Sequence, residues 1–530
     1  MISKAVKKLT SSRVSTTFTN QLTDSGMNFV KLLVTFLLGI LIPFSFAPFD
    51  YWPLAILSVA LFQWQLDQVN SAKSAFKLGW SYGFGVFLAG ASWVYVSIHE
   101  YGYAPIPLAL IMTGLFTFLL GLFFALQGYC YKRLAVSSPL LNALVFAATW
   151  VLFEWIRSWM LTGFPWLYLG YGHINSWLSG WAPVFGVFGV SLVAALTASA
   201  LKFVISQQSC GKYAYFIAAT LLLWPLGFLF AQINWTEAQR EVSVTLMQGN
   251  IPQEKKWQKE YRPVSLSTYR QLNRNVDSDL IIWPETAIPY FKHQVSDWLA
   301  ETERQLKPHQ GLITGLPYYD PNSPAETPVL HNSIIGLGSA SGQYHKQKLV
   351  PFGEYVPLQD ILRGLIQFFN LPMSNFRPGP SEQPPLKLQG MNLLPAICYE
   401  IAYPEFIASN MQFEDQQQDL IITISNDAWF GDSIGPKQHL QIAQMRALEN
   451  SRYVLRATNT GLTAVIDEKG IITYSMPDFV SGGLNATATT HQGLTPYSQW
   501  LNYPLLVLIV LILVGINLFP IIFSASKPTN

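Results

Sequence analysis

Eight apolar segments constrain this chain more than any other feature of its sequence. A helix needs about 20 mainly apolar residues to cross the hydrocarbon core of a bilayer. The second segment is short and contains Gln63 and Gln65, so the first two segments are also compatible with a hairpin that does not span fully. The segments cover residues 29–47, 51–66, 75–97, 104–130, 139–158, 178–202, 214–233 and 501–523. The sequence therefore predicts a polytopic α-helical membrane domain.

Composition agrees with a membrane protein and argues against several other classes. Half of the residues are hydrophobic and 12% are charged, whereas soluble chains carry about 25% charged residues. The net charge of +2 gives no indication of nucleic-acid binding. Three cysteines are too few for a disulfide framework. Cys130 and Cys210 lie in or beside apolar segments, where we expect small buried side chains.

Basic residues follow an alternating pattern along the predicted spans. The other loops carry Asp50, His99, Glu100 or mostly uncharged residues. Basic loops stay in the cytoplasm, so both termini are predicted there and the long segment before the last span faces outward. The basic residues are Lys4, Lys7, Lys8, Arg13, Lys73, Lys77, Lys132, Arg133, Lys202, Lys212 and Lys527.

These patterns divide the chain into five parts. A cytoplasmic tail covers residues 1–28, and a membrane domain of about seven helices covers 29–234. An exported domain covers 235–500, a C-terminal transmembrane helix 501–523, and a second cytoplasmic tail 524–530.

The exported segment alternates short β-rich runs with amphipathic stretches. Helices are predicted over 256–275, 294–307 and 436–450. Strands alternating with helices indicate a layered α/β domain. The predicted strands are Val242–Gln248, Leu280–Trp283, Leu312–Thr314, Ser333–Leu337, Leu394–Ile397, Leu420–Ser425, Tyr453–Ala457 and Thr463–Ile466.

Four residues of this segment have the types needed for covalent acyl transfer. Cys398 is its only cysteine and ends a predicted strand, and Glu285 follows another. A thiol needs a base or a positive neighbour to become a nucleophile. Glu285 is the candidate base, and Lys346 is the candidate oxyanion donor together with the Tyr399 N–H. Glu354 could hold Lys346 in place or share in the proton transfer. Taken singly, each has an ordinary structural interpretation.

An apolar stretch follows Glu354, between Asp360 and Arg377. Phe368 and Phe369 are two of the seven apolar residues that form an apolar arm between residues 361 and 371. One interpretation is a helix packed in the core, and the other is an arm that dips into the bilayer over the site. The second interpretation predicts that these two phenylalanines contact lipid substrate.

The order Glu285, Lys346, Glu354, Cys398 resembles the nitrilase or carbon–nitrogen hydrolase superfamily, whose members form an α-β-β-α sandwich. The whole chain past its tail is similar to the apolipoprotein N-acyltransferase family. The motifs that carry this resemblance are Phe46-Ala-Pro-Phe-Asp50, Trp93-Val-Tyr-Val-Ser-Ile98, Gly163-Phe-Pro-Trp166, Val350-Pro-Phe-Gly-Glu-Tyr-Val-Pro357 and Thr495-Pro-Tyr497.

The resemblance implies a reaction, its partners and a location. An acyl chain would pass from a phospholipid, through a Cys398 thioester, to the N-terminal amine of a diacylglyceryl-cysteine apolipoprotein. Trp257, Tyr399 and Glu400 match positions near the substrate or nucleophile in the family. The implied protein is a monomer of the bacterial inner membrane with its catalytic domain in the periplasm, without cofactor or metal.

Two other functions are compatible with parts of the sequence. A membrane-tethered nitrilase-like amidohydrolase acting on a small soluble substrate would need no apolar arm. A transporter or receptor with an inactive nitrilase-like domain would not need the intact set of four residues. It would also be expected to carry ionisable residues along its spans.

Overall fold

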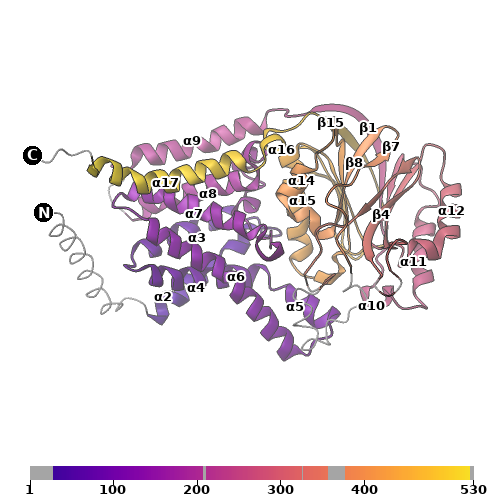
Figure 1. The fold of residues 1–530 in the computed structure, drawn as a ribbon, viewed down its shortest axis with the longest axis horizontal. Coiled ribbons are helices and arrows are strands. Elements are labelled where there is room, and N and C mark those ends of the chain that lie inside the picture. Colours follow the sequence, from indigo (N-terminus) through magenta and orange to yellow (C-terminus); the bar gives the residue numbers. More distant parts are fainter. Residues whose placement is uncertain are drawn as a thin grey trace, which may run out of the picture.

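The computed structural model divides into a helical half and a half built around β-sheets. The two halves lie end to end along the long axis of the molecule (Figure 1). It describes residues 28–206, 211–324, 326, 328–351, 353–355 and 376–525 of the 530-residue chain. Both predicted tails fall largely outside these ranges, as does Cys210.

The helical half contains a helix at the place of each of the eight apolar segments. Within the described residues, four helical stretches are long and apolar enough to cross a membrane, namely 106–134, 139–157, 177–205 and 214–231. A fifth arises if α4 and the bent piece Val94–Tyr101, at 63° to it, form one span. The helices are α2 (Phe29–Ile40), α3 (Trp52–Asp67), α4 (Ala72–Gly90), α6 (Ile106–Leu134), α7 (Pro139–Arg157), α8 (Ala182–Ile205), α9 (Ala214–Ala231) and α17 (Tyr503–Ala525).

Glycines allow these helices to pack with their backbones in close contact. A Cβ placed on Gly79 of α4 would lie 2.1 Å from the carbonyl oxygen of Phe124 in α6. Gly39 of α2 has the same relation to Tyr82 of α4, again at 2.1 Å. Small residues at such crossings are a common device of membrane helices.

The other half is a sandwich of two sheets. One has the order β15-β1-β2-β3-β4-β6 and the other β14-β13-β12-β11-β8-β7-β5. The strands of the first are β1 (Glu237–Gln248), β2 (Leu280–Ile282), β3 (Gly311–Tyr319), β4 (Leu330–Gly338), β6 (Gln343–His345) and β15 (Gly482–Gln492). Those of the second are β5 (Ala340–Ser341), β7 (Leu386–Leu388), β8 (Met391–Ile397), β11 (Leu420–Ser425), β12 (Val454–Thr458), β13 (Thr463–Ile466) and β14 (Ile472–Met476).

Apolar side chains fill the space between the sheets, and helices cover the outer faces. Leu246 and Ile282 of the first sheet share a buried core with Ile397 and Ile422 of the second. Helices α11 (Arg262–Leu272) and α12 (Ser296–Gln305) cover the first sheet. Helices α14 (Pro404–Ser409) and α15 (Gly435–Asn450) cover the second. The α-β-β-α sandwich is therefore confirmed.

Helix α15 (Gly435–Asn450) lies between the two halves. On one side it packs on the second sheet through Leu440 and Ala443. On the other side, Ile442 and Met445 belong to the same buried core as the helices of the helical half, which is called the membrane half from here on. This helix thus joins the two cores.

Candidate active site

The topology brings the predicted catalytic residues to one edge of the sandwich. Strands β1, β2 and β3 run parallel, as do β8, β11 and β12. The carboxyl ends of parallel strands meet at the same edge of a sheet. Glu285 follows β2, Cys398 follows β8, and Lys346 directly follows β6.

Lys346 lies between two carboxylates and is buried. Its Nζ is 2.8 Å from Glu354 Oε2, 2.9 Å from Glu354 Oε1 and 3.6 Å from Glu285 Oε1. Burial by itself lowers the pKa of Lys346, but the carboxylates of Glu354 and Glu285 outweigh burial and hold this pKa above its usual range. The ammonium is therefore a permanent positive charge in the site.

Asn332, in β4, joins the two carboxylates, and the sequence analysis missed it. Its Nδ2 donates to Glu285 Oε1 at 2.7 Å and to Glu354 Oε1 at 2.9 Å. Glu285 Oε2 also accepts from the backbone N–H of Asn426 at 2.8 Å, and Glu354 Oε2 from that of Val350 at 2.8 Å. Its place directly before the predicted apolar strand Ser333–Leu337 is the signal that could have indicated it.

Cys398 stands on a strained turn at the end of β8. Its φ of 53° lies in the left-handed region, which is uncommon for a residue with a side chain and is found at functional sites. The residue is partly exposed. Burial of the thiol and the nearby Glu285 carboxylate raise the pKa of Cys398 well above its ordinary value, against the opposite effect of Lys346. The resting sulfur is thus a thiol that needs a base.

A second buried lysine, which the sequence patterns did not indicate, bonds to the backbone of Glu285. Lys256 ends α10 (Gln253–Lys256), and its Nζ donates to the backbone carbonyl of Glu285 at 3.1 Å. Burial lowers the pKa of Lys256 to about 8, although the Glu285 carboxylate opposes this effect. The neighbouring Trp257 is half-buried, and its indole nitrogen has no hydrogen-bond partner among the described residues.

Glu400 is fully buried and faces the backbone instead of open space. It accepts hydrogen bonds from the N–H groups of Ile397, Gln347 and Lys348 and from the hydroxyl of Tyr344. These bonds tie the turn after β8 to the segment that carries Lys346. Glu400 is therefore placed to position the site, and its direct contact with substrate stays a prediction.

The nucleophile turn η8 (Cys398–Ala402) rests on a loop of the membrane half. The hydroxyl of Tyr399 donates to the carbonyl of Gly163 at 3.2 Å. The hydroxyl of Tyr403 donates to the backbone carbonyl of Thr162 at 2.8 Å. The thiol is thus held where the two halves meet.

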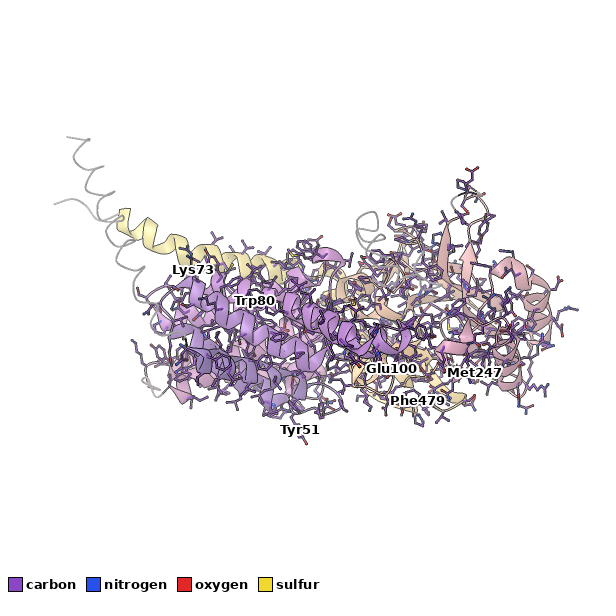
Figure 2. All side chains as sticks on the ribbon, turned by 90° about the horizontal axis from the view of Figure 1, so that it is seen from below. Tyr51, Lys73, Trp80, Glu100, Met247 and Phe479 are labelled. Carbon is purple, nitrogen blue, oxygen red and sulfur yellow. The ribbon has the colours of Figure 1, made fainter. Side chains whose placement is uncertain are left out.

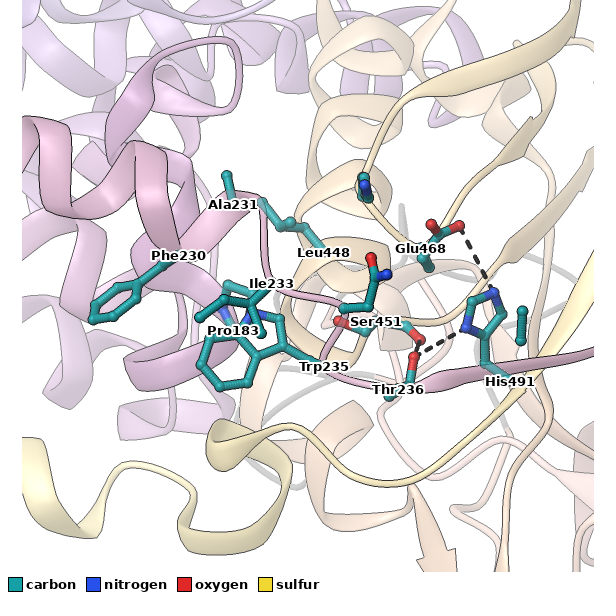
Figure 3. A pocket seen from close by; sticks show the side chains of 13 residues that line it. Pro183, Phe230, Ala231, Ile233, Trp235, Thr236, Leu448, Ser451, Glu468 and His491 are labelled. Carbon is teal, nitrogen blue, oxygen red and sulfur yellow. Dashed lines mark hydrogen bonds and ion pairs between the residues drawn. The ribbon is translucent and has the colours of Figure 1, made fainter.

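The predicted apolar arm, possible metal ligands and a cavity add nothing to the geometry of the four predicted catalytic residues. Phe368 and Phe369 lie outside the described residues. Within the described ranges, no group of three or more His, Cys, Asp or Glu side chains could hold a metal ion. A cavity of about 140 Å³ lies where α9 leads into β1, between Trp235 and His491 (Figure 3), and none of the four predicted catalytic residues lines it.

Comparison with known proteins identifies the class. Residues 38–200 match the model of the apolipoprotein N-acyltransferase N-terminal domain, and residues 243–490 match that of the carbon-nitrogen hydrolases. Fold and matches together define a membrane-bound enzyme with a nitrilase-like domain.

Curated relatives then identify the family. An apolipoprotein N-acyltransferase of Azotobacter vinelandii is 46% identical over 90% of this chain and 92% of its own length. One of Pseudomonas aeruginosa is 47% identical over 88% and 91%. One of Coxiella burnetii is 39% identical over 92% and 99%. The chain belongs to the apolipoprotein N-acyltransferase family, as its sequence motifs predict.

Proposed function

We propose that this enzyme moves a fatty acyl chain from a phospholipid to the N-terminal amine of a diacylglyceryl-cysteine apolipoprotein. The single observation that carries the proposal is the contact of the nucleophile turn with the membrane half, through Tyr399 and Tyr403. A thiol that acts on a small soluble substrate has no need of this position.

The first step acylates the enzyme. The Glu285 carboxylate takes the proton of the Cys398 thiol as the sulfur attacks the ester carbonyl carbon. Lys346 and the Tyr399 N–H stabilise the oxyanion of the tetrahedral intermediate. The ester C–O bond then breaks, Glu285 returns the proton to the leaving oxygen, and a lysophospholipid departs, leaving a thioester.

The second step transfers the chain. The α-amino nitrogen of the apolipoprotein attacks the thioester carbonyl, and Glu285 accepts a proton from that nitrogen. The C–S bond breaks, an amide forms, and Glu285 returns that proton to the sulfur of Cys398. This order of events is a ping-pong mechanism. Glu354 and Asn332 keep Lys346 and Glu285 in place through both steps.

The position of the thiol avoids a large hydrophobic cost. Moving an acyl chain into water costs about 0.8 kcal/mol per methylene, so about fifteen methylenes would cost about 12 kcal/mol. Beside the Gly163 loop, Trp159, Met160 and Leu161 are 51%, 40% and 91% exposed. These apolar side chains offer a lipid-like surface next to the nucleophile turn.

We further propose that the sheet half faces the periplasm, that the helices lie in the inner membrane, and that the enzyme is a monomer. Figure 2 labels Lys73 at the end of the membrane half that is far from the sheets, and Glu100 beside them. The positive-inside rule places the lysine end in the cytoplasm. Asp50, in an acidic loop, accepts a hydrogen bond from Gln441 of α15 at 3.1 Å.

Mass spectrometry of the peptide that contains Cys398 tests this function. The purified enzyme is incubated with phospholipid vesicles, and we expect an acyl increment that hydroxylamine removes. Cys130→Ser, which changes the other described cysteine, should keep the increment, whereas Cys398→Ala should lose it together with acyl transfer. An unmodified Cys398 peptide in a protein that still transfers acyl chains would refute the thioester route.

A further inference from the structure

A buried histidine contacts the backbone carbonyl of the nucleophile. His439 lies on α15, and its Nε2 is 3.2 Å from the backbone carbonyl oxygen of Cys398. A carbonyl oxygen can only accept a hydrogen bond, so Nε2 carries the proton and donates. The strained φ of Cys398 is thus accompanied by a specific bond to its carbonyl.

A buried network fixes the His439 ring. Its Nδ1 is 3.1 Å from Asp427 Oδ1 and 3.2 Å from Arg456 Nη2. Asp427 pairs with Arg456 and accepts from the hydroxyl of Ser425 at 2.6 Å. Burial and the nearby guanidinium lower the pKa of His439, against the effect of Asp427. With its proton on Nε2, a neutral ring donates to the Cys398 carbonyl and accepts from Arg456 at Nδ1, and Nδ1 could donate to Asp427 only if it were protonated as well.

Because the peptide group is planar, the direction of the Cys398 carbonyl sets the direction of the Tyr399 N–H. The Cys398–Tyr399 peptide is trans, and in a trans peptide the C=O and N–H point in opposite directions. With the Cys398 carbonyl held toward α15, the Tyr399 N–H must point away from α15. That N–H is the second oxyanion donor of the proposed mechanism.

We propose that His439 is a positioning residue that aims the Tyr399 N–H at the oxyanion by holding the Cys398 carbonyl. The inference rests on the proposed function, because it concerns the acylation of Cys398. It differs from a packing role, which the ring could fill beside Trp166, whose ring centroid is 5.5 Å away. A packing role would affect every reaction of the thiol alike.

Two reactions of Cys398 separate these roles. Acylation by a p-nitrophenyl ester passes through an oxyanion, whereas alkylation by iodoacetamide displaces iodide and forms none. Both rates are measured on the full-length enzyme in detergent, for the wild type, His439→Asn and His439→Gln. The Asn amide reaches the place of Nδ1 and loses the bond to Cys398, whereas the Gln amide can place its N–H near Nε2.

Loss of one oxyanion donor costs about 10²–10³-fold in rate, and a misaimed donor should cost about 10–100-fold. We expect His439→Asn to lower the acylation rate by about 10–100-fold while alkylation stays within about twofold. His439→Gln should recover most of the loss. If His439→Asn is not recovered from membranes, His439→Met, which has the length of Gln and no donor, takes its place.

Three outcomes would overturn the inference. Acylation of His439→Asn at the wild-type rate removes any role in the oxyanion site. A parallel fall of acylation and alkylation indicates packing alone. Failure of the Gln variant to exceed the Asn variant excludes the hydrogen bond as the cause. A wild type that is alkylated at Cys398 but never acylated refutes the proposed function itself, a result that is recognisable before any variant is compared.

Discussion

Replacement of Lys256 by methionine tests whether the Lys256 side chain is buried as a cation next to Glu285, the proposed base. Burial lowers the pKa of Lys256 from 10.5 to about 8. One pKa unit corresponds to about 1.4 kcal/mol, so the buried charge opposes folding by about 3 kcal/mol at neutral pH. Methionine has a similar length and no charge.

The sign of the pH dependence follows from proton linkage. A lysine whose pKa is lower in the folded state loses its proton first in that state, so the unfolded chain binds more protons between about pH 8 and pH 10.5. Stability of the wild type therefore rises across this window, and the cost is complete only below about pH 8. The methionine variant lacks this contribution at every pH.

Thermal unfolding followed by tryptophan fluorescence measures the effect. Between about pH 7 and about pH 9 the linkage amounts to about 1.4 kcal/mol, which is about 3–5 °C in Tm for a domain of this size. We expect the Tm of the wild type, relative to Lys256→Met, to rise by that amount. Lys255→Met changes the exposed neighbour on the same helix and should show no such pH-dependent difference. A Tm difference for Lys256→Met that is equal at both pH values would refute the reasoning.

Two further substitutions test the site and the membrane packing. Asn332→Ala removes hydrogen bonds to both Glu285 and Glu354, each worth about 1.5–3 kcal/mol; we expect acylation by p-nitrophenyl ester to fall about 10–100-fold with normal membrane insertion, and a full rate would contradict the proposed role. Gly79→Leu would place its Cβ 2.1 Å from a backbone oxygen of α6 and should lower Tm by about 5 °C or more. Gly114→Leu, whose Cβ meets nothing within 4 Å, is the matched control; an equal Tm for the two variants would contradict the packing argument.

The sequence predicted the parts of the site that end strands. Apolar runs such as 280–283 and 394–397 indicate strands on their own. Cys398 directly follows the second run, and Glu285 follows the first after Pro284. Asn332 and Lys256 could not be assigned from these patterns, because their roles depend on contacts between segments far apart in the chain. Asn332, for example, is 47 residues from Glu285 in sequence and 2.7 Å from it in space.

Helix α15 shows why polar residues mislead an analysis based on periodicity. Apolar residues at helical spacing predicted the helix over 436–450, but this spacing does not show what polar residues such as Gln438 and Glu449 contact. In the structure Gln438 accepts from the indole of Trp166 at 2.8 Å, and Glu449 accepts from the backbone of Val187 at 2.7 Å. These bonds cross to the membrane half, and hydropathy does not distinguish a polar group bonded to protein from one bonded to water.

Every residue of α15 except Lys437 and Gln444 is buried, and this has a consequence for how the protein matures. Before the membrane half has assembled, the sheet half exposes the face of this helix that carries Ile442 and Met445, which pack on the helices. We therefore expect the two halves to depend on each other for stability, since Tyr399 and Tyr403 beside the nucleophile also bond to the membrane half. A sheet half produced without the membrane half would lack the apolar side chains on which one face of α15 packs.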